Sequence, residues 1–178
     1  MTALSDLRNR GKVGLARALA ALEASPDAPE VTGLLDVAHR APIGVVLGLT
    51  GPPGVGKSTL IDSLIRALRA RGKTVAVIAV DPSSRISGGA LLGDRTRFST
   101  DPEDEGVFVR SMAARDRLGG VAEITYPASI LMRALYDLVI VETVGVGQSE
   151  TQIADMADMV AFCAQPGSGD ALQFMKAG

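Results

Sequence analysis

Gly51-Pro52-Pro53-Gly54-Val55-Gly56-Lys57-Ser58 is the stretch of this sequence that decides the fold. It fits the pattern G-x-x-x-x-G-K-[ST], in which a glycine-rich backbone surrounds phosphate groups. Residues 43–50, which precede it, are apolar and have strand composition. Leucines and isoleucines at helical spacing follow it over residues 59–68. Strand, glycine loop and helix therefore come in the order that a phosphate-binding loop requires.

The residue types of this stretch suit a phosphate ligand. Glycines adopt backbone conformations closed to other residues, and they let amides approach a ligand closely. Lys57 would reach the β- and γ-phosphates of a nucleotide, and the Ser58 hydroxyl would ligate Mg²⁺. The alternative, a glycine turn with a chance Lys-Ser pair, is disfavoured by the flanking strand and helix patterns. We therefore expect the nucleotide to be bound by Gly51, Pro52, Pro53, Gly54, Val55, Gly56, Lys57, Ser58 and Thr59.

A second chemical signal lies in residues 137–145, where an apolar run ends in Glu142 and a glycine, Gly145, follows. Proteins with this loop place here the carboxylate that holds Mg²⁺ and a glycine beside the γ-phosphate. A strand that ends in glutamate by chance is the competing interpretation. Gln148, in the turn that follows, is a candidate for orienting the attacking water. The predicted catalytic residues are thus Lys57, Glu142 and Gln148.

Composition excludes several classes of protein. The chain has 178 residues and a net charge of −2, so no basic field invites nucleic acid. It has no Trp, two Tyr and four Phe, which disfavours base-stacking surfaces. No apolar run is long enough to span a membrane. Cys163 is the only cysteine, so no internal disulfide forms, and we expect a buried, inert thiol in a cytoplasmic protein without a signal peptide.

The order of patterns predicts an α/β fold with an open, mostly parallel sheet between layers of helices. We expect a helical extension over residues 1–42 and a nucleotide-binding core over 43–178. Within the core, residues 82–105 read as a functional loop, and a helix from 119 to about 135 is expected to start late or kink at Pro127. Residues 159–164 are predicted to form a further buried strand.

Together, these motifs resemble the MeaB/ArgK family of GTPases, chaperones of adenosylcobalamin-dependent methylmalonyl-CoA mutase. The resemblance covers most of the chain from residue 43 onward. It is carried by the stretches Gly51-Pro52-Pro53-Gly54-Val55-Gly56-Lys57-Ser58-Thr59, Ala79-Val80-Asp81-Pro82-Ser83-Ser84, residues 87–97, Leu118-Gly119-Gly120, residues 141–150 and Pro166-Gly167-Ser168-Gly169-Asp170.

The resemblance implies a P-loop NTPase core of the SIMIBI type that binds GTP, GDP and Mg²⁺. It implies Mg²⁺ ligation, directly or through water, by Ser58, Asp81, Asp94 and Glu142. It also implies a third switch loop that reports the nucleotide state to the mutase, or to a related acyl-CoA mutase, through Asp170, Gln173 and Lys176. For these three residues a solvated surface is an equally good interpretation. Full-length members of the family are expected to form homodimers.

The sequence departs from the family pattern in two respects, the guanine-recognition motif and the C-terminal dimerisation arm. The family reads guanine through an Asn-Lys-x-Asp motif, which these 178 residues do not contain. We therefore expect an N-terminal fragment that lacks the motif and the dimerisation arm, and that separates guanine from adenine nucleotides by less than about tenfold.

Alternative functions remain open at this point. They are a P-loop ATPase or small-molecule kinase of the ArgK transport type, and a non-catalytic module that responds to nucleotide. A nickel-delivering GTPase is disfavoured because the chain has one Cys and one His.

Overall fold

The computed structural model describes residues 3–81, 98–113, 124–143 and 152–166. This part of the chain contains a five-stranded sheet of order β3-β2-β4-β1-β5, in which every pairing is parallel. The strands are β1 (Val45–Thr50), β2 (Val75–Asp81), β3 (Val107–Ala113), β4 (Leu138–Glu142) and β5 (Met159–Phe162). The predicted parallel α/β fold is therefore confirmed.

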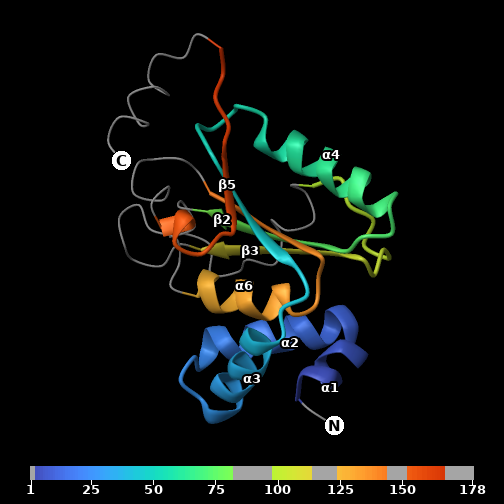
Figure 1. Cartoon of the computed structure of the whole chain (residues 1–178), viewed down its shortest axis with the longest axis vertical. Coiled ribbons are helices and arrows are strands. Elements are labelled where there is room, and N and C mark those ends of the chain that lie inside the picture. Colours follow the sequence, from blue (N-terminus) through green and yellow to red (C-terminus); the bar gives the residue numbers. More distant parts are fainter. Residues whose placement is uncertain (1–2, 82–97, 114–123, 144–151, 167–178) are drawn as a thin grey trace.

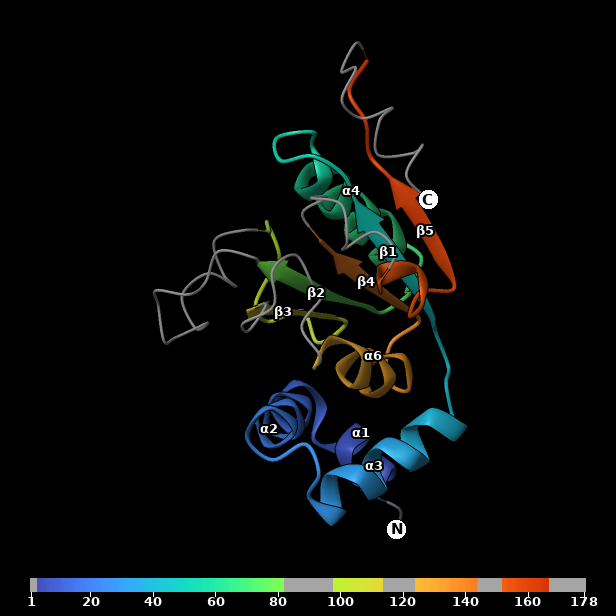
Figure 2. The ribbon, with the colours of Figure 1, turned by 90° about the vertical axis from the view of Figure 1, so that its left-hand side faces the viewer.

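Alternation along the strands divides the core into two halves. In β2, the side chains of Val75, Val77 and Ala79 pack with Ile61 and Ile65 of α4 (Lys57–Arg69). The residues between them face the other way, toward α6 (Thr125–Arg133). Figure 1 and Figure 2 show these two helices on opposite sides of the sheet. An almost unbroken apolar run is what a parallel strand covered on both faces requires.

Three N-terminal helices form a further layer beneath α6 (Figure 2): α1 (Ala3–Asn9), α2 (Gly11–Ala24) and α3 (Pro29–Arg40). The helical conformation is interrupted between α1 and α2 at Gly11, whose φ is +52°. Leu15, Leu19 and Leu22 of α2 are almost fully buried and belong to the same core cluster as Leu131 of α6. The N-terminal extension thus packs against α6, which in turn covers one face of the sheet. A domain boundary at residue 42 stays a prediction.

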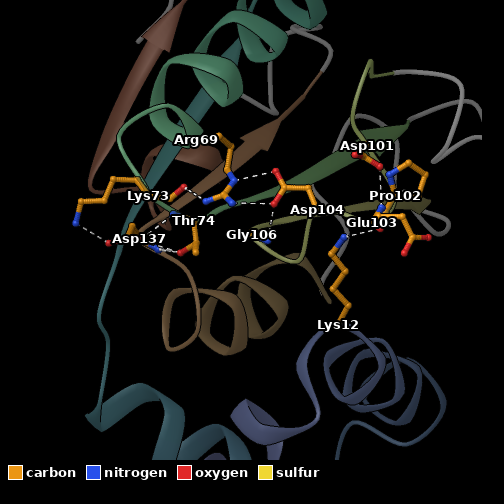
Figure 3. A network of polar contacts seen from close by, with 10 residues as sticks. All are labelled: Lys12, Arg69, Lys73, Thr74, Asp101, Pro102, Glu103, Asp104, Gly106 and Asp137. Carbon is orange, nitrogen blue, oxygen red and sulfur yellow. Dashed lines mark hydrogen bonds and ion pairs between the residues drawn. The ribbon is translucent and has the colours of Figure 1, made fainter.

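One ion pair also joins the extension to the sheet directly. Arg110 of β3 donates from Nη2 to both carboxylate oxygens of Glu23 in α2, at 3.0 and 2.9 Å. Lys12, also in α2, donates to the carbonyl oxygen of Pro102 at 2.9 Å (Figure 3). These contacts tie α2 to β3 and to the segment before it.

At the amino-terminal edge of the sheet, Asp137 holds the start of β4 against the start of β2 (Figure 3). Its carboxylate accepts hydrogen bonds from the Thr74 amide and hydroxyl, both at 2.8 Å, and from Lys73 at 2.9 Å. The Thr74 amide, followed by the side chains of Lys73 and Thr74, lowers the pKa of Asp137 to about 2. This edge lies opposite the glycine loop.

A second carboxylate acts in the same way between α4 and β3. Asp104 accepts two hydrogen bonds from Arg69, at 2.9 and 2.8 Å, and one from the Gly106 amide at 2.9 Å. The Arg69 side chain, and then that amide, lower the pKa of Asp104 below its usual value. The end of α4 and the start of β3 are thereby held together.

The strand predicted over residues 159–164 is present as β5, but the prediction that it is buried is wrong. Met159 is 68% exposed and Val160 39% exposed. The physical reason is position, because in the described part of the chain β5 pairs only with β1 and so lies at the edge of the sheet. Hydrophobic composition alone does not distinguish an edge strand from a central one.

Two smaller predictions concern α6 and Cys163. The helix begins at Thr125, so that Pro127 lies in its first turn, where proline is tolerated; residues 114–123 lie outside the described chain. Cys163 is half-buried rather than buried, because it directly follows the edge strand. His39 is exposed near the end of α3.

Candidate nucleotide-binding site

The glycine loop lies at the carboxyl-terminal edge of the sheet, between β1 and α4 (Figure 1). Three of its glycines have positive φ angles: +142° at Gly51, +77° at Gly54 and +97° at Gly56. Gly51 is required for a second reason, because a methyl group there would collide with the carbonyl oxygen of Cys163. Gly56 is the N-cap of α4, so the loop leads straight into the positive end of that helix dipole.

Lys57 points back over this loop. It is only 5% exposed, and its Nζ donates to the carbonyl oxygens of Gly51 at 2.7 Å and Pro52 at 2.9 Å. An ammonium group held by carbonyl oxygens beside the loop is able to bind phosphate oxygens in their place. Ser58, half-buried, and Thr59, exposed, follow in the first turn of α4, where helix amides lack intrahelical partners.

Glu142 is the last residue of the central strand β4 and is 2% exposed. In the sheet register it lies between Leu49 of β1 and Ala79 of β2. Its side chain falls on the α4 face of the sheet, because Leu138 and Ile140, four and two residues earlier, pack in the α4 half of the core. Lys57 and Glu142 therefore lie at the same edge and on the same side of the sheet.

Cys163 lies within the electrostatic influence of both charged side chains. Burial raises the pKa of its thiol, the charge of Lys57 lowers it, and the charge of Glu142 raises it. Both charged side chains thus act on the same sulfur atom from the loop region. A thiol with a raised pKa stays protonated near neutral pH, which agrees with the expectation that Cys163 is not a nucleophile.

The segment after β5 contacts the loop directly, which the sequence analysis did not foresee. The Cys163 amide donates to the Thr50 carbonyl at 2.8 Å, and Gln165 Nε2 reaches the Gly54 carbonyl at 3.5 Å. No spacing in the sequence places residues 163–165 beside residues 50–54. The contact results from the parallel pairing of β5 with β1.

The predicted metal ligands are only partly within the described chain. Ser58 and Glu142 are placed, Asp81 is placed by its backbone at the end of β2, and Asp94 lies outside. Within the described ranges, no group of three or more His, Cys, Asp or Glu residues is arranged to hold a metal ion. A hydroxyl and a buried carboxylate are nevertheless the oxygen donors that suit Mg²⁺. Gly145, Gln148, Asp170, Gln173 and Lys176 also lie outside the described residues.

Across the parts of the chain that the structure describes, no helix is long and apolar enough to cross a membrane.

Sheet order, glycine loop and buried lysine define a nucleotide-binding protein of the P-loop α/β class. A solved structure described as the LAO/AO transport system kinase has this fold, with a TM-score of 0.64 and 34% sequence identity. The match covers 90% of this chain and 48% of that one.

The model of the family described as methylmalonyl-CoA mutase-associated GTPase MeaB matches residues 15–178. The chain belongs to this family. GTPase ArgK of Escherichia coli is 47% identical over 133 residues, which are 74% of this chain and 40% of ArgK. The mitochondrial methylmalonic aciduria type A homolog of Mus musculus is 45% identical over 138 residues, which are 77% of this chain and 33% of the mouse protein.

A protein of Pyrococcus horikoshii aligns over the whole chain at 44% identity, and the aligned region is 57% of that protein. The chain thus spans about half, or less, of the length of the curated relatives it matches.

Proposed function

We propose that this chain carries the nucleotide-binding site of a Mg²⁺-dependent GTPase. One observation supports this more than any other: the buried Lys57 caps the glycine loop on the side of the sheet where the buried Glu142 ends β4. GTP hydrolysis needs positive charge at the β- and γ-phosphates and a held metal, but little covalent chemistry from the protein. The family membership supports guanine as the base.

Each residue has a distinct part in the proposed reaction. The loop amides and Lys57 would bind the phosphates and neutralise the charge that develops on them. Ser58, Asp81, Asp94 and Glu142 would hold Mg²⁺, which would supply positive charge to the phosphates. Gly145 would contact the γ-phosphate, and Gln148 would orient the attacking water.

Calorimetric titration with GDP and with ADP, each with and without Mg²⁺, tests this proposal. We expect saturable binding of GDP at one site per chain, strengthened by Mg²⁺. Because the sequence contains no Asn-Lys-x-Asp motif, we expect less than about a tenfold preference of these 178 residues for GDP over ADP. No binding of either nucleotide would contradict the proposal.

For the whole protein, we propose that the GTPase gates the delivery of adenosylcobalamin to methylmalonyl-CoA mutase or a related acyl-CoA mutase. The family description, which names the mutase, supports this, as does the methylmalonic aciduria name of the mouse relative. Loss of the γ-phosphate would change the third switch loop, and the mutase would respond through its residues Asp170, Gln173 and Lys176. We place the protein in the cytoplasm, since one cysteine suits a reducing compartment.

Titration of the full-length protein with purified mutase tests this second step. We expect the affinity to differ between the GDP-bound and GTP-analogue-bound forms. Equal affinity in both forms would contradict gating by nucleotide.

The structural neighbour described as a transport system kinase favours one other reaction, phosphoryl transfer to a small molecule. The product separates the two. Release of inorganic phosphate in step with GDP formation supports hydrolysis, and GDP formation without free phosphate supports a kinase.

A further inference from the structure

Two threonine hydroxyls are buried next to the nucleotide loop and have no role in the function proposed above. Thr50 directly precedes Gly51 and is 1% exposed, and Thr143 directly follows Glu142 and is 2% exposed. Neither Oγ1 atom has a hydrogen-bond partner among the residues that the structure describes. A buried hydroxyl without a partner costs stability, so such a pair calls for an explanation.

The two side chains are neighbours across β1 and β4. The Thr143 amide donates to the Leu49 carbonyl at 3.0 Å, which extends the β1–β4 ladder by one step beyond the pair Leu49–Glu142. Thr50 consequently lies opposite Thr143. Both side chains fall on the α6 face, because Val46 and Val141 on the same strands pack in the α6 half of the core.

The floor below the two hydroxyls is apolar and tightly packed. A methyl group added to Gly48, two residues before Thr50, would lie 2.8 Å from the fully buried Ile153. The neighbours of Gly48 on this face are thus apolar side chains, Ile153 and Ala157, which offer the hydroxyls no hydrogen bond. Neighbouring parallel strands lie about 4.8 Å apart, a spacing that one water molecule can bridge with two hydrogen bonds.

We propose that Thr50 and Thr143 are positioning residues that share one ordered water molecule, which ties the first residue of the glycine loop to the end of β4. Through this water on the α6 face, the backbones of Gly51 and Glu142 keep a fixed separation. The Glu142 side chain, on the opposite α4 face, thereby keeps its position relative to the glycine loop. The inference rests on the proposed nucleotide site, because it assigns the pair a role in holding that site in shape.

The test compares Thr50→Val, Thr143→Val and the double variant with the Thr→Ser changes at the same positions. Valine keeps the shape and removes the hydroxyl, whereas serine keeps the hydroxyl. We expect each valine variant to weaken Mg²⁺–GDP binding by about threefold to tenfold, measured by calorimetry, and each serine variant to retain most of the affinity. The double valine variant should lose no more than a single one, because both remove the same water.

Thr125→Val is the matched control. Thr125 is fully buried on α6, and its hydroxyl also lacks a partner within the described chain, but it does not flank the loop or Glu142. We expect unchanged GDP affinity for this variant, and thermal midpoints close to wild type for all of them.

Four results would overturn the inference. These are unchanged GDP affinity in both valine variants, serine variants as impaired as valine variants, additive losses in the double variant, and a thermal midpoint lowered by about 5 °C or more in the single valine variants. Failure of the wild-type chain to bind GDP would instead overturn the proposed function itself.

Discussion

Lys57 carries a full charge at a position where only 5% of its surface is exposed. Carbonyl oxygens of Gly51 and Pro52 compensate for the lost hydration. Phosphate oxygens would do so better, because they carry net negative charge. At the scale of single residues, the site is therefore built around a buried charge that backbone carbonyl groups hold in place.

Replacing Lys57 by alanine tests this role. We expect Lys57→Ala to weaken GDP binding by at least about tenfold and to abolish phosphate release from GTP, since the charge facing two phosphates is removed. Lys73→Ala is the control, because Lys73 is an exposed lysine at the opposite edge of the sheet, paired with Asp137. Turnover of Lys57→Ala at the wild-type rate would exclude the loop as the active site.

Glu142→Gln separates metal binding from folding. The amide has nearly the same shape as the carboxylate but lacks the charge that Mg²⁺ requires. We expect a large loss of GDP affinity in the presence of Mg²⁺ and a small one in its absence, measured by parallel titrations. Equal losses under both conditions would assign Glu142 a structural role at the end of β4.

Asp137 predicts how stability changes with pH. Because its pKa is lowered to about 2 from 3.8, its contribution is complete above pH 4 and is lost as the pH falls toward 2. We expect Asp137→Asn to lower the free energy of unfolding on the order of 1 kcal/mol at pH 7, a value that allows for the partial exposure of this carboxylate. In urea unfolding, the difference from wild type should vanish near pH 2.

The exposed Asp155 provides the control for this measurement, and Asp155→Asn should change the stability little at any pH. A difference between wild type and Asp137→Asn that stays constant from pH 7 to pH 2 would show that the carboxylate charge is not what stabilises the edge.

At the scale of elements, β4 and β5 have similar apolar sequences but opposite environments. Ile140 of β4 is fully buried between neighbouring strands and the α4 layer, whereas Met159 of β5 is 68% exposed. We expect Ile140→Ala to lower the free energy of unfolding by about 2–5 kcal/mol and Met159→Ala by less than about 0.5 kcal/mol. Urea unfolding measures both, and equal costs would mean that β5 is covered in solution.

At the scale of the whole molecule, the question is whether the N-terminal helices and the sheet unfold together. Leu19 of α2 is fully buried in the same cluster as Leu131 of α6 and Val139 of β4. Both tyrosines of the chain, Tyr126 and Tyr136, lie in or shortly after α6, so tyrosine fluorescence reports on the packing of this helix between the extension and the sheet.

We therefore expect Leu19→Ala to lower the stability measured by tyrosine fluorescence by about 2–5 kcal/mol, with the same midpoint by circular dichroism. Val13 lies on the same helix and is 62% exposed, so Val13→Ala is the control and should change the stability little. If Leu19→Ala left the midpoint of the tyrosine fluorescence transition unchanged, the extension and the sheet would unfold separately.

The sequence by itself determined the parallel α/β fold, the glycine loop and the strand that ends in Glu142. These features depend on local rules: glycines where φ must be positive, apolar runs where both faces of a strand are covered, and a carboxylate where a central strand ends. Such rules act between residues that are close in the chain.

Only the tertiary structure decided that β5 lies at the edge of the sheet formed by the described residues, that Cys163 and Gln165 contact the glycine loop, and that Thr50 and Thr143 lie side by side. Each depends on which strands are neighbours, and the order β3-β2-β4-β1-β5 brings together residues about 90 to 110 positions apart. The apolar sequence pattern of a strand is the same whether the strand has one neighbouring strand or two. The difference lies in burial and backbone pairing across the sheet, which arise only when the chain has folded.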